Sequence, residues 1–572
     1  MRNNHRSTIL TLIEDCKSMA QLKQLHAHII TTAQVGDAIP MSRLLDFCAN
    51  SEAGDLHYAH SIFLRIHRPS VFIWNSMIKG LSNANEGAHA LSMYREMQRS
   101  GYPPDHFTFP FVLRSCAKIS DGEFGKCVHG RLLKTGFRSD LYVSSSLIHA
   151  YVSRGDLPSG RMVFDEMPKR NVVSWSTLIA GYVGNNQASE AIRVFKEMEL
   201  AGVEPNEITM VNVLVACAEL RDLETGKWVH SHLRRSGMDP FPSDSNPNSR
   251  WNVILATAIL DMYAKCGNLK VARQLFNAMP HRNVISWNTM LCAYNHYGRA
   301  LEAVRLYAHM HNADVKPDEV TLLSLLGACT QLGALGLGQG AHSYIEKTNI
   351  HKDIAVSTAL LDMYAKCGDT HSAFQIFSCL CRKDLVAWTS MITGLAMHGS
   401  AEGALGLFQQ MQEEGVIPDH VTYIGVLCAC SHAGLVDESC RHLESMTNVY
   451  GIVPTIEHYG CVVDLLSRAG RLEEAVKVVE SMPTNANIAL WSALLSGCGI
   501  HSDIDAAERV NKNIIELNLQ SSGVYVLLSN AYAIAERWKE VERTRELMRR
   551  KGIGKIHGHS YIEVKKLSEP GS

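Results

Sequence analysis

Apolar side chains recur along most of this chain at three- and four-residue spacing, in runs of about a dozen residues separated by short breaks. Residues 284–318 show the pattern: an apolar-striped run, WNTMLCAYNHYG, is followed by ALEAVRLYAHM, which places Ala303, Leu306 and Met310 on one face. Pro317 then prevents the second run from continuing. The segment is therefore predicted to form two helices joined by a short turn.

The two-helix pattern repeats with a fixed period. Four similar phrases, VFIWNSMIKG, VVSWSTLIAG, VISWNTMLCA and LVAWTSMITG, each contain a tryptophan, and successive tryptophans are 101, 112 and 101 residues apart. These are Trp74, Trp175, Trp287 and Trp388. The octapeptide LDMYAKCG likewise occurs twice, at 260–267 and 361–368. The longer middle separation contains DPFPSDSNPNSR at 239–250, which is typical of an inserted surface loop of about 11 residues.

Each period divides into units of 35, 35 and 31 residues. A helical hairpin of this size cannot bury its own apolar stripe, so adjacent hairpins must stack into an all-α solenoid. We predict an N-terminal segment with a degenerate repeat at 1–37, a repeat array at 38–487 and an extension at 488–572. The predicted units of the array are 38–70, 71–105, 106–140, 141–171, 172–206, 207–252, 253–283, 284–318, 319–353, 354–384, 385–419, 420–455 and 456–487.

Composition narrows the possible partners. The net charge of −2 argues against indiscriminate phosphate binding, which needs a basic excess, but it allows a nucleic acid to be read through its base edges. No uninterrupted apolar run reaches the roughly 18 residues that span a membrane, so no membrane partner is expected. The 16 cysteines are scattered, and we expect reduced thiols that pack as small apolar side chains. The N-terminus is basic, but Glu14 and Asp15 make it a weak targeting signal.

Two short motifs contain residues that could bind a metal. His442 and Glu444 match the first half of the HxE…PCxxC pattern of zinc deaminases, but no CxxC follows them. Cys428, Cys430 and His432 are also ligand types, although on a single helix their side chains would point to different sides. We therefore interpret both motifs as structural.

Three histidines, His129, His230 and His342, recur at repeat spacing. Equivalent positions of separate repeats are too far apart to share one ion, so these side chains are predicted to pack between helices. The sequence contains no GxxxxGK[ST] phosphate loop and no plausible nucleophilic triad. We expect no catalytic activity, no cofactor and no bound metal.

The repeat phrases resemble a known family. The 35-residue hairpin ending in GVxPD, together with LDMYAKCG, VFDEMPKRN at 163–171 and KPDEVTLLSLLGAC at 316–329, is similar to plant pentatricopeptide repeat proteins of the PLS subgroup. The resemblance covers nearly the whole chain. It implies a right-handed superhelical α-solenoid of about 14 helix-turn-helix repeats with C-terminal helical E-type motifs.

The C-terminal region resembles the E-type extension of the same family. The similar segments are IALWSALLSGCGIHSDIDAAERV at 488–510, GVYVLLSNAYAIAERWKEVERTRELMRRKGIGK at 523–555, and HGHSYIEV at 557–564, which resembles the family's PGxSWIEV. The chain then stops at Ser572, without the deaminase-like DYW domain of some relatives.

The resemblance implies a binding site for single-stranded RNA, read one base per repeat by the fifth and the last residue of each unit. Within the family, Asn at the fifth position selects pyrimidines, and Ser or Thr selects purines. A last Asp only accepts hydrogen bonds and suits G or U, whereas a last Asn also donates and suits A or C. The pairs and their bases are Asn75/Asp105 (U), Ser145/Asn171 (A), Ser176/Asn206 (A), Thr257/Asn283 (A), Asn288/Asp318 (U), Thr358/Asp384 (G) and Thr389/Asp419 (G).

The pairs together predict the target 5′-U-n-A-A-n-A-U-n-G-G-n-n, where n is a base that the long units leave unspecified. Long units carry atypical fifth residues such as Pro110 and Leu323. By the same resemblance, apolar second residues would sandwich the bases, and these are Phe72, Val173, Ile254, Ile285 and Val386. Helix capping is the competing interpretation of any single Asn or Asp in this set.

The resemblance implies that the chain is a site-recognition factor for C-to-U editing of organellar transcripts. Its expected partners are single-stranded organellar RNA, a DYW-type deaminase acting in trans, and the multiple organellar RNA editing factors. The mitochondrion is the expected compartment, with the chloroplast as the alternative. Two other functions stay open: splicing, stabilisation or translation of an organellar RNA, and a protein-binding scaffold without RNA.

Overall fold

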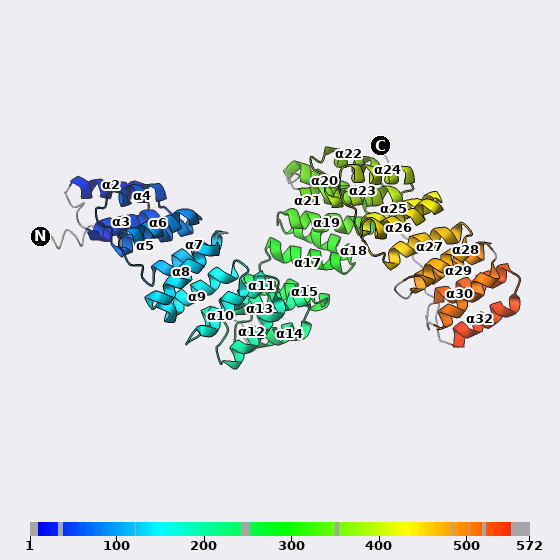
Figure 1. Ribbon diagram of the computed structural model, residues 1–572, viewed down its shortest axis with the longest axis horizontal. Coiled ribbons are helices and arrows are strands. Elements are labelled where there is room, and N and C mark those ends of the chain that lie inside the picture. Colours follow the sequence, from blue (N-terminus) through cyan, green and yellow to red (C-terminus); the bar gives the residue numbers. More distant parts are fainter. Residues whose placement is uncertain are drawn as a thin grey trace, which may run out of the picture. The chain divides into compact units, whose positions relative to one another are not determined.

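The computed structural model describes residues 10–31, 38–119, 122–241, 252–348, 354–482, 486–501, 503–516 and 522–550. Regular structure in these ranges is helical, and they contain no strand. The chain divides into two compact units, Met1–Thr289 and Met290–Ser572, and each is described by itself (Figure 1). The motif HGHSYIEV and most of the predicted insertion lie outside the described residues.

In the first unit, the first helices of successive hairpins lie side by side and form what we call the A row. The second helices, the B row, pack against the A row. The A row consists of α3 (Ala38–Asn50), α5 (Val71–Asn83), α7 (Thr108–Lys118), α9 (Leu141–Val152), α11 (Val172–Gly184), α13 (Glu207–Leu220) and α15 (Val253–Lys265). The B row consists of α4 (Leu56–Phe63), α6 (Gly87–Arg99), α8 (Gly122–Thr135), α10 (Leu157–Glu166), α12 (Ala188–Leu200), α14 (Leu223–Arg235) and α16 (Leu269–Ala278). Helix α2 (Met19–Thr31) precedes them, η2 (Phe137–Ser139) follows α8, and α17 (Val284–His296) contains the division between the units.

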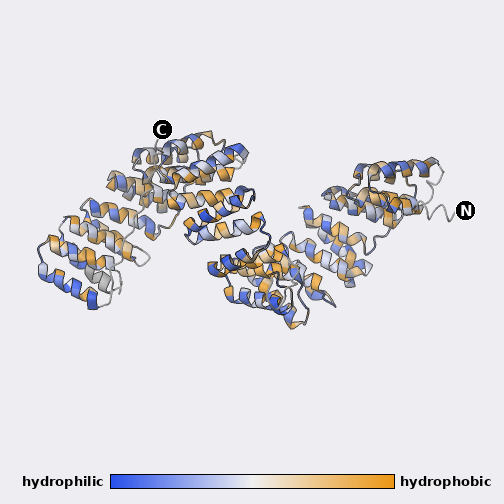
Figure 2. Ribbon diagram, turned by 180° about the vertical axis from the view of Figure 1, so that it is seen from behind, coloured by the Kyte–Doolittle hydropathy of each residue, from blue (hydrophilic) through white to orange (hydrophobic). Residues whose placement is uncertain are grey.

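The second unit is built in the same way. Its A row consists of α19 (Glu319–Leu332), α21 (Ile354–Lys366), α23 (Leu385–Met397), α25 (His420–Ala433), α27 (Ile456–Arg468), α29 (Ile488–His501) and α31 (Ser522–Ile534). Its B row consists of α18 (Ala300–Asn312), α20 (Leu335–Thr348), α22 (Thr370–Cys379), α24 (Ala401–Glu413), α26 (Val436–Asn448), α28 (Leu472–Glu480), α30 (Ile504–Glu516) and α32 (Trp538–Arg550). Hydrophobic and hydrophilic residues alternate around the helices (Figure 2), as expected where each helix buries one stripe. None of the described helices is long and apolar enough to cross a membrane.

The repeated tryptophans form the core between successive hairpins. Trp175 on α11 meets Phe164 on α10 edge-on, with ring centroids 4.6 Å apart. Trp388 on α23 meets Phe377 on α22 in the same way at 4.9 Å. The same edge-to-face contact therefore recurs once in each period of the sequence. Aromatic pairs favour this geometry.

The histidines that recur at repeat spacing each contact a tyrosine on the next A-row helix. His230 Nδ1 lies 3.1 Å from the hydroxyl of Tyr263, and His342 Nδ1 lies 3.0 Å from that of Tyr364. His129 pairs with Tyr151 in the same manner at 2.8 Å. The predicted packing between helices is confirmed, and the tyrosine of LDMYAKCG is one partner in two of these pairs.

Cysteine burial also follows the expected pattern. All 16 cysteines are free thiols. Burial raises the pKa of Cys217, of Cys329 and of Cys430 to about 12, so these thiols stay protonated at neutral pH. Within the described ranges, no group of three or more His, Cys, Asp or Glu side chains is placed to hold a metal ion. His442 packs edge-on against Phe408 with a centroid distance of 5.6 Å, which agrees with a structural role.

Candidate functional site

The last residue of every predicted pair caps the next A-row helix. Its Oδ1 accepts a hydrogen bond from the backbone N–H three residues later, for example 3.0 Å from Ser174 N to Asn171 and 2.8 Å from Thr422 N to Asp419. The same contact is present for Asp105, Asn206, Asn283, Asp318 and Asp384. The capping interpretation is therefore correct for all seven residues. A ligand can therefore form hydrogen bonds only with the side-chain atom that does not cap the helix.

Capping leaves one side-chain atom whose chemistry depends on the residue. A backbone N–H donor orients the amide of Asn171 with Oδ1 towards the helix, so Nδ2 is the remaining group and is a donor. In Asp384 the remaining atom is Oδ2, an acceptor. Neither remaining atom forms a hydrogen bond within the described part of the chain. The caps thus present a donor or an acceptor according to the identity of one residue.

The fifth residues are mostly buried at the start of the A-row helices. Asn75, Ser145, Ser176, Asn288, Thr358 and Thr389 are all buried, and Thr257 is partly exposed. Two pairs are in direct contact: Asn75 Nδ2 donates to Asp105 Oδ1 over 2.9 Å, and Ser176 Oγ lies 3.5 Å from Asn206 Oδ1.

The other pairs are not joined directly. No hydrogen bond connects the members of Ser145/Asn171, Thr257/Asn283, Thr358/Asp384 or Thr389/Asp419 in the described residues. Asn288 lies in the first unit and Asp318 lies in the second, so each residue is described only within its own unit.

The carboxyl group of Asp105 has a lowered pKa. Partial burial opposes ionisation, but hydrogen bonds from the Asn75 amide, from the Thr108 backbone and hydroxyl, and from the Phe107 backbone outweigh it and lower the pKa of Asp105. The carboxylate is therefore ionised, and acts only as an acceptor, at neutral pH.

Apolar second residues are exposed on the same surface. Phe72, Val173, Ile254, Ile285 and Val386 are 45, 49, 66, 62 and 57% exposed. The same register also exposes five side chains that were not singled out from the sequence, namely Phe107, Tyr142, Ile208, Val320 and Val421. The signal that finds them is simple, because each is the second residue of its unit.

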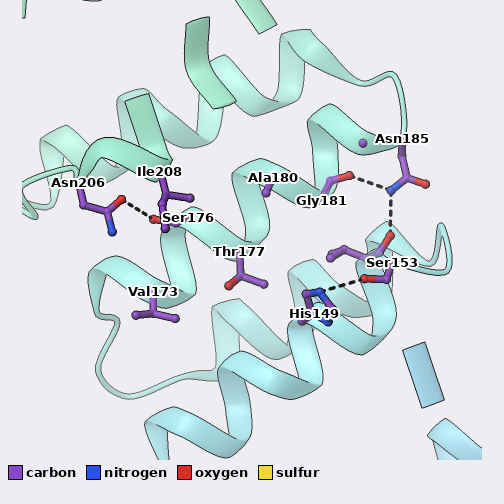
Figure 3. A pocket seen from close by; sticks show the side chains of 12 residues that line it. His149, Ser153, Val173, Ser176, Thr177, Ala180, Gly181, Asn185, Asn206 and Ile208 are labelled. Atoms are coloured by element: carbon purple, nitrogen blue, oxygen red, sulfur yellow. Dashed lines mark hydrogen bonds between the residues drawn. The ribbon is translucent and has the colours of Figure 1, made fainter. Parts of the chain in front are cut away.

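Second residues and reading pairs meet in two hollows. In the first unit, a hollow of about 390 Å³ is lined by Ser176, Asn206 and the second residues Val173 and Ile208 (Figure 3). Val173 and Ile208 come from successive A-row helices, and Ser176 and Asn206 lie beside Ile208. The hollow is therefore lined by apolar second residues and by a polar pair.

The second hollow lies in the second unit and measures about 550 Å³. It is lined by both predicted G-reading pairs, by the second residues Ala355, Val386 and Val421, and by Asp362 and Lys366. The second residue of the unit that contains Thr358 is the small Ala355.

Family models match successive segments of the chain between residues 69 and 563. The PPR repeat family matches 69–118, 170–219, 282–331 and 383–432, and the PPR repeat matches 142–172, 255–284, 356–385 and 457–485. A pentatricopeptide repeat-containing protein of Arabidopsis thaliana is 47% identical over 566 residues, which cover 99% of this chain and 100% of that protein. The chain belongs to the pentatricopeptide repeat proteins. An E motif matches 501–563, as in E-type members of the PLS subgroup.

Other relatives extend the comparison. Two further pentatricopeptide repeat-containing proteins of Arabidopsis thaliana are 36 and 37% identical; the first is named mitochondrial and the second chloroplastic. The alignments cover 97 and 98% of this chain, and 85 and 78% of those proteins. A solved structure of PPR10, a maize pentatricopeptide repeat protein, in complex with an 18-nt psaJ RNA element has a TM-score of 0.53 at 15% identity, covering 95% of this chain and 91% of that chain. At this identity the similarity concerns the fold, and the prediction of an all-α solenoid of stacked hairpins is confirmed.

Proposed function

We propose that this pentatricopeptide repeat protein binds single-stranded RNA in a sequence-specific way, through the exposed face of its A-row helices. The observation that carries the proposal is the hollow of the first unit, which is lined by Ser176 and Asn206 and by the second residues Val173 and Ile208. Apolar side chains beside hydrogen-bonding groups suit a flat base with a hydrogen-bonding edge. The PPR10 structure, which contains bound RNA, has the same fold.

Helix capping supplies a physical basis for base choice. Because Oδ1 is held by the backbone, a last Asp offers Oδ2 as an acceptor, which pairs with the ring N–H of G or U. A last Asn offers Nδ2 as a donor, which pairs with the ring nitrogen of A or C. One residue can therefore cap a helix through Oδ1 and select a base through its other side-chain atom.

The fifth residue completes the assignment. In Asn75/Asp105, the Asn75 amide has one N–H bound to Asp105 and one left over. That donor, with Asp105 Oδ2 as acceptor, matches the carbonyl and the ring N–H of U. Extending the assignments to all seven pairs gives the target 5′-U-n-A-A-n-A-U-n-G-G-n-n.

Within this RNA-binding function, the role is site recognition for C-to-U editing of organellar transcripts. The E motif at 501–563 supports it, as do the relatives named mitochondrial and chloroplastic. The protein selects the site without catalysing the reaction, a DYW-type deaminase acts in trans, and multiple organellar RNA editing factors join the complex. We place the protein in the mitochondrion.

Binding of the full chain to synthetic RNA tests the proposal. The predicted target should bind about tenfold or more tightly than a variant in which both G positions are U, because each mismatched base edge leaves a polar group unpaired. Equal affinity for the two RNAs would contradict the base assignments. Organellar transcripts compared with and without the protein test the role: loss of editing at a cytidine supports it, and altered splicing or abundance with editing unchanged argues for the alternative.

A further inference from the structure

The third residue of each predicted long unit is a fully buried threonine that contacts the last residue of the preceding standard unit. Four such residues occur, Thr108, Thr209, Thr321 and Thr422, all 0% exposed. Long units carry apolar fifth residues of their own, so this buried hydroxyl has no role in a pair within its own unit.

In the second unit, Thr422 connects both members of one pair. Its Oγ1 lies 2.8 Å from Oγ1 of Thr389 and 2.8 Å from Oδ1 of Asp419. The fifth and last residues of this pair have no direct hydrogen bond. Thr422 is the only side chain in the described structure that joins them.

The first unit shows a related arrangement, in which Ser176 Oγ also donates to the carbonyl of Val172 over 2.6 Å. Thr209 Oγ1 lies 2.6 Å from Ser176 Oγ and 2.8 Å from Asn206 Oδ1. Thr108 Oγ1 lies 2.7 Å from Asn75 Oδ1, and this contact holds the Asn75 amide with Nδ2 towards Asp105.

The units that follow short units lack this threonine, so the fifth residue of a short unit has no threonine hydroxyl of this kind beside it. The unit that follows Thr358 is 385–419, and its third residue is Ala387, which has no hydroxyl. Thr358 Oγ1 is buried without a hydrogen-bond partner in the described structure. The unit that follows Ser145 is 172–206, and its third residue is Ser174. In the described structure the Ser174 hydroxyl has hydrogen bonds to the backbone of Asn171. Ser145 donates to the carbonyl of Leu141 over 2.7 Å instead.

We infer that the third-position threonine of a long unit is a specificity-determining positioning residue for the base read by the preceding unit. A serine or threonine hydroxyl on a helix has a competing acceptor in the carbonyl four residues earlier. In the second unit the hydroxyl of Thr389 contacts Thr422, and in the first unit the hydroxyl of Ser176 contacts both Thr209 and the carbonyl of Val172. Long units therefore take part in base reading although their own fifth residues are apolar.

The inference rests on the proposed function, but it can be tested separately from it. The last residue is held by the backbone N–H of Thr422, which every side chain at that position would keep. Loss of the Thr422 hydroxyl should therefore affect discrimination by the fifth residue, purine against pyrimidine, and spare discrimination by the last residue, G against A.

The test uses Thr422→Val, which keeps the shape and removes the hydroxyl, in the full-length protein. RNAs carry G, U or A at the base read by unit 385–419. The preference for G over U should fall about five- to tenfold, as expected for one lost hydrogen bond, while G over A changes less than about twofold. Thr422→Ser should restore the preference. In the first unit, Thr209→Val should likewise lower the preference for A over C at the base read by 172–206.

Ser174→Ala provides the matched control, because it removes a capping hydroxyl that does not touch the fifth residue Ser145. It should leave the base preference of unit 141–171 unchanged. Equal weakening of all RNAs by Thr422→Val, or unchanged ratios, would overturn the inference and leave the proposed function intact. A wild-type protein without any base preference would overturn both.

Discussion

Asn75 and Asp105 are 30 residues apart in the chain, and Asn75 Nδ2 donates a hydrogen bond to Asp105 Oδ1 over 2.9 Å. The fifth and the last residue of one unit are thus neighbours at the start of two successive A-row helices, α5 and α7. The cap and this contact both use Oδ1 of Asp105, so in the proposed function Oδ2 is the atom that meets the base.

Replacement of Asp105 by Asn tests this arrangement. In Asp105→Asn the cap is retained through Oδ1, and the outward atom changes from an acceptor to a donor. Preference at the base read by unit 71–105 should shift from U towards C by about tenfold or more. Competition binding with RNAs that differ only at that base measures it. A variant that still prefers U would show that the last residue does not read the base.

The lowered pKa of Asp105 makes a second prediction, for stability against pH. The pKa of Asp105 in the folded state lies below the ordinary value of 3.8, so the ionised carboxylate stabilises the fold above that pH. The stabilisation is lost as the pH falls through the lowered folded-state pKa. Urea unfolding should therefore show a larger difference between wild type and Asp105→Asn at about pH 6 than at about pH 3. A difference independent of pH would mean that ionisation of Asp105 does not contribute.

Much of the fold could be predicted from the sequence, because its determinants are local and repeated. The spacing of apolar residues within 284–318 predicts a hairpin, and the tryptophan period predicts that hairpins stack. The reading pairs also could be located by register, since fifth and last residues are counted from the unit boundaries. Their role in RNA binding stays a prediction.

Hydrogen bonding of the fifth residues could not be predicted. The hydroxyls of Ser145 and Thr389 occupy equivalent positions, yet the first bonds to Leu141 O and the second to Thr422. The choice depends on a side chain 33 residues away across a helix interface, and three rotamers are open to each hydroxyl. Spacing along the chain contains no information on that choice.

The histidine–tyrosine pair assigns a structural role to LDMYAKCG. Tyr263→Phe removes the hydroxyl that contacts His230 and leaves a buried ring nitrogen without that partner. We expect the free energy of unfolding to fall by about 1 kcal/mol or more. Tyr142→Phe, at an exposed tyrosine of α9, should change it by less than about 0.5 kcal/mol and serves as the control. Equal effects of the two substitutions would argue against a stabilising pair.

Thiol reactivity should separate buried from exposed cysteines. Burial raises the pKa of Cys217 and of Cys329 from 9.0 to about 12, so at pH 8 their thiolate fraction falls by a factor on the order of 10³. Cys379 and Cys381 are exposed. Iodoacetamide followed by mass spectrometry should label the exposed pair first in the native protein, and urea should abolish the difference. Early labelling of Cys217 in the native state would contradict its burial in the core.

The exposed second residues give the last prediction. Val173 and Ile208 flank the hollow of the first unit and are 49 and 64% exposed without RNA, so replacing both with serine removes little buried apolar surface. The free energy of unfolding should change by less than about 1 kcal/mol, whereas RNA affinity should fall about tenfold or more, because a stacked base contributes about 1–3 kcal/mol. The loss should be similar for every base at that position, since stacking does not distinguish base edges. Ser176→Ala provides the contrast, because it should lower the preference for A over C with a smaller loss in overall affinity. If the double serine variant bound RNA as well as the wild type, Val173 and Ile208 would be surface residues without a role in the site.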